Sequence, residues 1–130
     1  MTIHPSAAQA PSEESILHAL RSLRAPIQRG EYDLHRLVMD CLESAGLPCT
    51  HEVPLGPNAR IDVLCGHVGI EIKRGHVGRS TVLRQLERYA ASPEIGSLIL
   101  VTEHTLNLPR HVGGKPLSQL CLARLWGIAL

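Results

Sequence analysis

The chain has 130 residues, of which 44% are hydrophobic and 19% are charged, and its formal net charge is +1. This composition is typical of one globular domain with an apolar core, and it excludes a uniformly basic protein that coats nucleic acid. No apolar stretch approaches the length of a membrane span, and residues 1–14 lack the apolar run of a signal peptide. We therefore expect a protein that does not enter a membrane.

Residues 1–11 are rich in Ala, Pro and Ser, and they predict a flexible tail before a single domain over residues 12–130. Ser12 is a suitable N-cap for a first helix over 13–24, which carries Glu13 and Glu14 in its first turn. A second helix is predicted over 31–45, and Gly46 ends it. Its apolar residues recur at helical spacing: Leu34, Leu37, Val38, Cys41, Leu42 and Ala45.

The hydrophobic pattern then changes to the alternation of strands. Strands are predicted over 49–55, 60–65 and 68–73, and the short turns between them favour antiparallel hairpins. A helix follows over 80–91, and the apolar run at 97–102 is typical of a strand that is covered on both faces. Residues 116–130 mix helical and strand-like spacing, so their structure stays open. This order predicts an α/β fold with a central mixed sheet flanked by helices.

Three charged residues interrupt the two apolar strands, namely Asp62, Glu71 and Lys73. Strand side chains alternate between faces, so Glu71 and Lys73 share one face, and Asp62 can reach it from the neighbouring strand. Carboxylates that converge must lose charge or hold a cation, and oxygen ligands suit Mg²⁺ or Mn²⁺. The set predicts metal-dependent hydrolysis of a phosphodiester, in which the metal activates water and Lys73 orients the attacking hydroxide.

The motif R-I-D, eight residues, then E-I-K over positions 60–73 resembles the PD-(D/E)XK nuclease superfamily, which has the restriction-endonuclease-like fold. Over residues 31–102 the predicted order of helix, three strands, helix and strand is similar to that family's common core. The resemblance implies that Asp62 and Glu71 bind the metal, that Lys73 is catalytic, and that Glu31 is a further acidic ligand on the first core helix. One departure is Ile61, which stands where the family name has proline.

A Gln-x-x-x-Tyr motif, Gln85 to Tyr89, lies on the helix after that strand, and some branches of the superfamily use this motif near the substrate and the metal. By this resemblance Gln85 is a candidate catalytic residue and Tyr89 a candidate substrate contact. The apolar spacing allows another interpretation, in which Tyr89 belongs to the core and Gln85 is solvated. Basic residues are candidate phosphate contacts, although a solvated helix face explains them equally well: Arg74, Arg79, Arg84 and Arg88.

The angular position of two acidic residues favours Glu31 over Asp33 as the acid of the second helix. At ~100° per residue, Glu31 falls about 45° from the centre of the apolar stripe and Asp33 more than about 100°. Glu31 is therefore predicted to lean over the sheet towards Asp62 and Glu71.

Two further interpretations stay open. The three charges could be a surface ion pair on an exposed hairpin. Alternatively, Cys49, His51, Cys65 and His67 could bind structural zinc, although C-x-H is not a usual zinc spacing. The four cysteines lack a C-x-x-C spacing, so the simpler expectation is a reduced, cytoplasmic protein with free thiols.

We therefore predict a small nuclease that depends on Mg²⁺ or Mn²⁺ and has DNA as its expected substrate. The chain has no room for a separate target-recognition domain, so cutting is expected to be structure-selective or weakly sequence-selective. By resemblance to Holliday-junction resolvases and small restriction enzymes we expect a homodimer, with the helix over 13–24 as a candidate interface. The alternative from another class is a non-catalytic nucleic-acid-binding or assembly module that keeps the fold.

Overall fold

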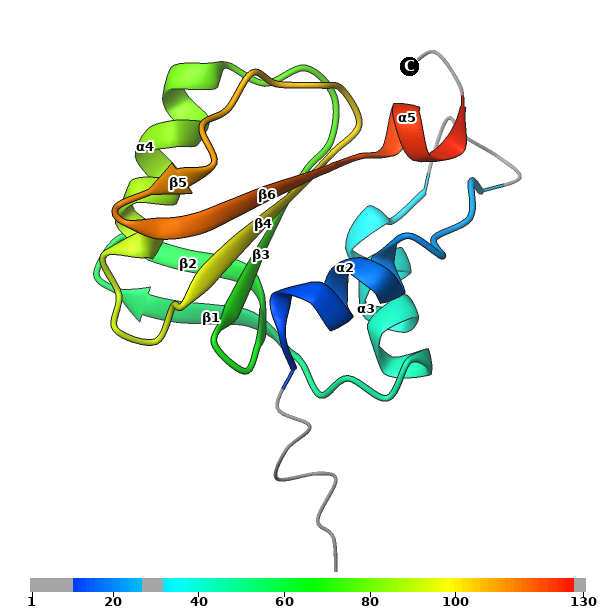
Figure 1. Cartoon of the computed structure of the whole chain (residues 1–130), viewed down its shortest axis with the longest axis horizontal. Coiled ribbons are helices and arrows are strands. Elements are labelled where there is room, and N and C mark those ends of the chain that lie inside the picture. Colours follow the sequence, from blue (N-terminus) through cyan, green and yellow to red (C-terminus); the bar gives the residue numbers. More distant parts are fainter. Residues whose placement is uncertain (1–10, 27–31, 128–130) are drawn as a thin grey trace, which may run out of the picture.

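A six-stranded mixed sheet forms the centre of the molecule in the computed structural model, which describes residues 11–26 and 32–127 (Figure 1). The order across the sheet is β1-β2-β3-β4-β6-β5. The bounds of these strands are β1 Thr50–Gly56, β2 Ala59–Cys65, β3 Val68–Lys73, β4 Ser97–Thr102, β5 His111–Val112 and β6 Lys115–Cys121. The first three strands form an antiparallel meander, β4 and β6 continue parallel to β3, and β5 pairs antiparallel at the far edge.

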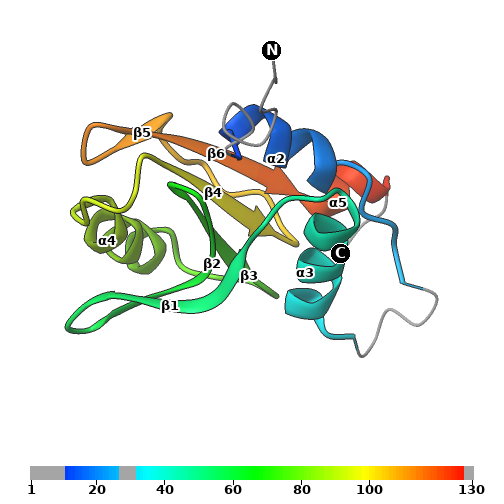
Figure 2. The ribbon, with the colours of Figure 1, turned by 90° about the horizontal axis from the view of Figure 1, so that it is seen from below.

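Helices cover both faces of this sheet. The four described helices are α2 Glu13–Leu20, α3 Leu34–Ser44, α4 Arg79–Ala90 and α5 Leu122–Trp126. Helix α4 lies on one side of the sheet, and α2 and α3 lie on the other (Figures 1 and 2). Two apolar clusters result, one beneath α4 and one beneath α2 and α3. The predicted α/β fold with a mixed sheet flanked by helices is therefore confirmed.

The strands that carry the candidate site lie close to where the sequence predicted them. The bounds of β3 and β4 match the predicted ranges, and every residue of β4 is buried, as expected for a strand covered on both faces. The ambiguous C-terminal stretch contains most of strand β6 and the short helix α5. Residues 1–10 of the predicted tail lie outside the described residues.

Both N-terminal helices are shorter than predicted. Ser12 caps α2 as expected, because its side chain accepts a hydrogen bond from the N–H of Ser15, but the helix ends at Leu20 rather than at 24. The N–H groups of Ser22 and Leu23 bond to carbonyls only three residues back, so the chain tightens into a turn. Helix α3 begins at Leu34 because Asp33 is its N-cap and accepts from the N–H of Arg36 at 3.1 Å.

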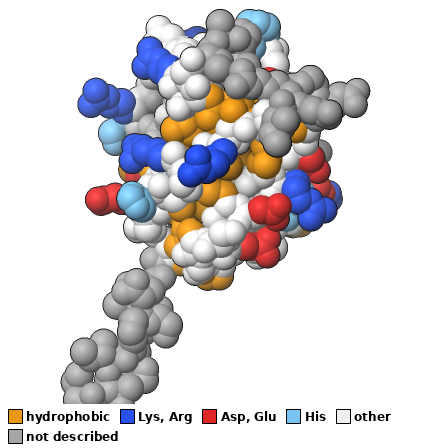
Figure 3. All heavy atoms as spheres, turned by 90° about the vertical axis from the view of Figure 1, so that its right-hand side faces the viewer, with side chains coloured by type: hydrophobic (Ala, Val, Ile, Leu, Met, Phe, Trp, Pro, Cys, Tyr) orange, Lys and Arg blue, Asp and Glu red, His pale blue; other side chains and the backbone are white. Residues whose placement is uncertain are grey.

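The apolar face of α2 is already used inside the chain, which corrects the basis of the dimer prediction. Ile16 and Leu20 are fully buried, and Leu23 is 7% exposed. These side chains pack in the core cluster with α3 and the sheet, so they are not available to a second copy. Other apolar side chains remain visible on the side of the molecule formed by α2, α3 and α5 (Figure 3).

Gly69 on β3 is required by the packing that surrounds the site. A Cβ at this position would lie 2.4 Å from Ile61 Cδ1 and 2.8 Å from Ile95 Cδ1, because both side chains cross the strand there. We expect Gly69→Ala to lower the free energy of unfolding by about 1–3 kcal/mol, the usual cost of overpacking a core. Gly96→Ala is the control, since its Cβ would make only ordinary contacts, the nearest at 3.4 Å. Equal urea denaturation curves for the two variants would contradict this packing.

Cys49 and Cys65 form a disulfide, which corrects the expectation of free thiols at these positions. The cause is the antiparallel β1–β2 register, in which Thr50 is opposite Leu64, so that Cys49, which precedes Thr50, faces Cys65, which follows Leu64. Cys41 and Cys121 remain free. The disulfide also occupies both thiols of the zinc interpretation, and it removes the cysteine-based argument for a reduced, cytoplasmic protein. No helix in the described part of the chain is long and apolar enough to cross a membrane.

Reducing this disulfide should destabilise the protein. The bond links residues 16 apart, and closing a loop of that size is worth about 2–3 kcal/mol through the entropy of the unfolded chain. We expect urea unfolding midpoints to fall on addition of a thiol reductant, and the Cys49→Ser, Cys65→Ser double variant to be insensitive to it. Labelling should find two free thiols before reduction, Cys41 and Cys121. Four reactive thiols in protein purified without reductant would contradict the pairing.

Candidate active site

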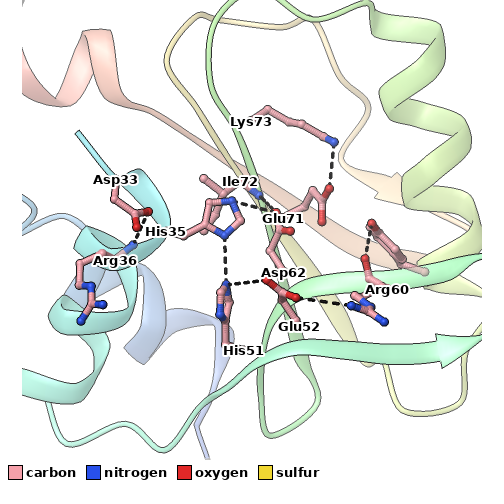
Figure 4. Close-up of polar contacts among 11 residues, drawn as sticks. Asp33, His35, Arg36, His51, Glu52, Arg60, Asp62, Glu71, Ile72 and Lys73 are labelled. Atoms are coloured by element: carbon pink, nitrogen blue, oxygen red, sulfur yellow. Dashed lines mark hydrogen bonds and ion pairs between the residues drawn. The ribbon is translucent and has the colours of Figure 1, made fainter. Parts of the chain in front are cut away.

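Asp62, Glu71 and Lys73 converge where β2 and β3 separate (Figure 4). Backbone pairing of these strands runs from Cys65↔Val68 to Val63↔Ile70 and does not extend to Asp62. There the side chain replaces the backbone acceptor, because Asp62 Oδ2 accepts a hydrogen bond of 2.7 Å from the N–H of Ile72. The carboxylate of Asp62 is thereby fixed beside β3, at the level of Glu71 and Lys73.

The neighbouring strand is irregular at the same level. His51↔Val63 and Val53↔Ile61 pair normally on either side, whereas Glu52 between them has a φ of 55°. A positive φ is uncommon for a residue with a side chain, and local irregularities of this kind re-aim side chains near functional sites. The carboxylate of Glu52 lies 3.5 Å from Arg60 Nη1 and 3.9 Å from His51 Nε2.

Glu71 is the buried member of the site. Its side chain is 3% exposed, and its Oε2 lies 3.0 Å from the ammonium of Lys73. Its other oxygen, Oε1, is buried and has no hydrogen-bond partner among the described residues. Burial, followed by the negative charge of Asp62, raises the pKa of Glu71 to about 7, and Lys73 opposes this rise. Near neutral pH this carboxyl group can therefore exchange its proton for another positive charge.

Tyr89 is both a core residue and a neighbour of the site. It is 1% exposed in the apolar cluster beneath α4, and its hydroxyl donates to the carbonyl of Arg60 at 2.9 Å. Burial, followed by the charge and closeness of the Glu71 carboxylate and by the charge of Asp62, raises the pKa of Tyr89 well above its usual value, and the nearby side chain of Gln85 opposes this. The structure thus brings the Gln85–Tyr89 motif to the carboxylates, with Tyr89 buried and Gln85 half-buried.

The helix acid is the part of the predicted site that the structure does not place. Glu31 lies outside the described residues. Tyr32 and Asp33 precede α3 rather than belonging to it, so the helical phase that favoured Glu31 does not apply to them. Asp33 is the N-cap of that helix.

The histidines nearest to the site were not among the predicted site residues. His35 on α3 places Nε2 3.9 Å from Asp62 Oδ2, and its Nδ1 lies 3.2 Å from His51 Nε2 on β1 (Figure 4). The sequence offered one signal for His35, since a residue in the first turn of the core helix can approach the strands. His51 drew attention only through its C-x-H spacing with Cys49.

The predicted basic contacts separate into two groups. Arg74 lies 3.1 Å from the carboxylate of Glu103 and 3.8 Å above the ring of Tyr32, and Arg79 donates to the carbonyl of Asn107. Burial alone would raise the pKa of Glu103, but hydrogen bonds from Tyr32, Gly75 and Arg74 hold it below its usual value. Arg74 therefore contributes to a structural cluster. Arg84 and Arg88 are exposed on α4.

Comparison with family models, with curated proteins and with solved structures finds no match for this chain. Within residues 11–26 and 32–127, no group of three or more His, Cys, Asp or Glu side chains is arranged to hold a metal ion. The site as described offers two carboxylates, Asp62 and Glu71. Such a donor set fits a hard divalent cation that keeps several of its waters, and the unpartnered Oε1 of Glu71 is an available ligand atom.

Proposed function

We propose that this protein is a metal-dependent nuclease that hydrolyses phosphodiester bonds, with DNA as its substrate. One observation carries the proposal: a buried carboxylate, Glu71, has an unpartnered oxygen and a pKa of about 7 between Asp62 and Lys73. Burying such a group is costly unless a ligand compensates it. A surface ion pair would not need a side chain that is 3% exposed.

Each residue has a distinct role in this proposal. Mg²⁺ or Mn²⁺, when bound, would neutralise phosphate charge and lower the pKa of a water molecule. Asp62 and Glu71 would hold the ion. Lys73 would donate a hydrogen bond to the attacking oxygen from its position 3.0 Å from Glu71, and Gln85 would orient Tyr89 beside it. Glu31 remains a proposed third ligand.

The order of elements supports a restriction-endonuclease-like core. An antiparallel meander of β1 to β3 is followed by α4 and by β4 parallel to β3, with α3 before the meander. This is the arrangement that the resemblance to the PD-(D/E)XK superfamily implies. The exposed Arg84 and Arg88 are proposed phosphate contacts because they lie on α4, the helix that carries Gln85 and Tyr89.

A homodimer remains part of the proposal, but the proposed interface is no longer the apolar face of α2. Partly buried apolar side chains that pack over the core beneath α2 and α3 are the better candidates: Leu17, Leu37, Leu47, Leu125 and Trp126. Light scattering that finds only monomer at concentrations where cleavage is intact would remove this part of the proposal.

The deciding experiment is a panel of labelled linear, nicked, branched and single-stranded DNA, with RNA counterparts, incubated with and without Mg²⁺ or Mn²⁺. We expect metal-dependent cleavage of at least one DNA and a preference set by its structure. Binding without cleavage under every metal condition would favour the non-catalytic nucleic-acid-binding module. The absence of both binding and cleavage, with every substrate and under every metal condition, would refute the nuclease proposal.

A further inference from the structure

Two histidines from different elements place ring nitrogens next to each other beside the carboxylate site. His35 on α3 and His51 on β1 approach with Nδ1 and Nε2 3.2 Å apart, and their ring planes are inclined at 67° (Figure 4). Their side chains are 38% and 39% exposed, so an ion from solvent can reach both.

The spacing of these nitrogens suits two ligands of one metal ion. Zinc–imidazole bonds are ~2.0–2.1 Å long, so two nitrogens 3.2 Å apart subtend about 100° at a shared ion. That angle lies between the values of octahedral and tetrahedral coordination. A hydrogen bond between neutral rings also fits this distance, so the test must separate the two states.

Both histidines are held by structure that is already rigid. Leu34 and Val38, which flank His35 on α3, are buried in the core cluster. His51 lies on β1 two residues after Cys49, whose disulfide ties the strand to β2, and it pairs with Val63. A site on such elements needs little ordering when the ion arrives.

The surroundings attract cations. The rings line an open hollow of about 250 Å³ together with Asp33, Asp40 and Glu43, against which Arg36 is the one positive charge of the lining. Glu52 lies 3.9 Å from His51 and Asp62 lies 3.9 Å from His35. Carboxylates around a concave surface raise the local concentration of positive ions.

We infer that His35 and His51 bind a divalent transition-metal ion, such as Zn²⁺, in a second cation site distinct from the Asp62–Glu71 pair. Imidazole nitrogen selects this class of metal over Mg²⁺. No third His, Cys, Asp or Glu of the described residues completes the set, so water fills the remaining positions. The inference does not rest on the proposed nuclease function.

Asp62 gives this site a link to the carboxylates. An imidazole that binds metal through one nitrogen usually offers the N–H of its other nitrogen to a carboxylate, which fixes the ring and raises its basicity. His35 has this arrangement in outline, with Nδ1 towards His51 and Nε2 towards Asp62. Asp62 would therefore orient His35 without binding its ion.

The test is a titration of metal-free protein with Zn²⁺, without reductant so that the Cys49–Cys65 disulfide stays closed, read by calorimetry and by the absorption spectrum of bound Co²⁺. With excess Mg²⁺ present to fill the Asp62–Glu71 pair, we expect one Zn²⁺ per chain. His35→Ala and His51→Ala should each weaken binding at least about tenfold, since loss of even an outer partner of a metal ligand costs about 10–100-fold. A Mg²⁺ excess should not compete.

Matched variants locate the ion. His76→Ala and His18→Ala, both outside the pair, should keep the wild-type affinity, and so should Glu71→Gln, which alters the other site. Circular dichroism checks that each variant is folded. The inference is overturned if no Zn²⁺ binds, or if both His35→Ala and His51→Ala bind it as tightly as wild type. Cleavage is not measured, so failure here is separate from failure of the nuclease proposal.

Discussion

Lys73→Ala and Glu71→Gln should each lower the cleavage rate of the best substrate at least about 100-fold, the usual cost of losing a group that stabilises developing charge. The expectation follows from geometry, because Lys73 Nζ and Glu71 Oε2 are 3.0 Å apart and both lie beside Asp62. Lys73→Ala removes the fixed charge and leaves both carboxylates. Glu71→Gln removes a metal ligand and keeps the shape of the side chain.

The rates are to be measured in single-turnover experiments at saturating Mn²⁺, on variants whose circular dichroism matches wild type. Glu52→Gln is the matched control: it removes a nearby carboxylate that is 54% exposed and faces His51 and Arg60 rather than Lys73. We expect less than about a threefold change there, since exposed ion pairs contribute little. A Lys73→Ala or Glu71→Gln protein that cuts at the wild-type rate would remove these residues from the active site.

The alternation of side chains along a strand was sufficient to predict the part of the site that lies on β3. The period of two in β3 placed Glu71 and Lys73 on the same face, and the structure joins them by an ion pair. The continuous apolar stretch Leu98 to Val101 within β4 correctly indicated a strand covered on both faces. These predictions depend only on neighbours in the chain, so no knowledge of tertiary contacts was needed.

Features that depend on pairing between strands were harder to predict. Asp62 reaches the site because the β2–β3 ladder stops at Val63, and its side chain then accepts from the N–H of Ile72. Nothing in the alternation of β2 indicates where the ladder stops. The disulfide did leave a signal, since Cys49 and Cys65 are each eight residues from Pro57 in the hairpin turn.

The start of the helix predicted over 31–45 was wrong although a local signal was present, whereas the contact between His35 and His51 was missed because it depends on residues far apart in the sequence. Asp33 immediately precedes the apolar stripe and is a good N-cap, which indicates a helix start at Leu34 rather than at 31. His35 and His51 are brought together by the packing of α3 beside β1, and that contact has no signature in either segment.

Glu71→Gln should also stabilise the metal-free protein at alkaline pH. The pKa of Glu71 is about 7 in the folded chain and 4.5 in the unfolded chain, so folding favours the protonated form of this carboxyl group. Below about pH 4.5 the residue is neutral in both states and costs nothing. As pH rises from 4.5 to about 7, the unfolded chain ionises first, and stability falls. Well above pH 7 the loss in the free energy of unfolding is complete, and it amounts to roughly 3 kcal/mol for a pKa shift of this size.

The difference between wild type and Glu71→Gln isolates this effect from other carboxylates, such as Glu103, whose lowered pKa gives stability that is lost in acid. Urea denaturation without metal should find similar stabilities at pH 4.5 and a more stable variant at pH 8. Adding Mn²⁺ at pH 8 should stabilise wild type and do less for the variant, because the ion replaces the proton as the charge partner of Glu71. A variant less stable than wild type at pH 8 without metal would mean that Lys73 compensates Glu71 fully. The site would then be a structural ion pair with no need of a cation.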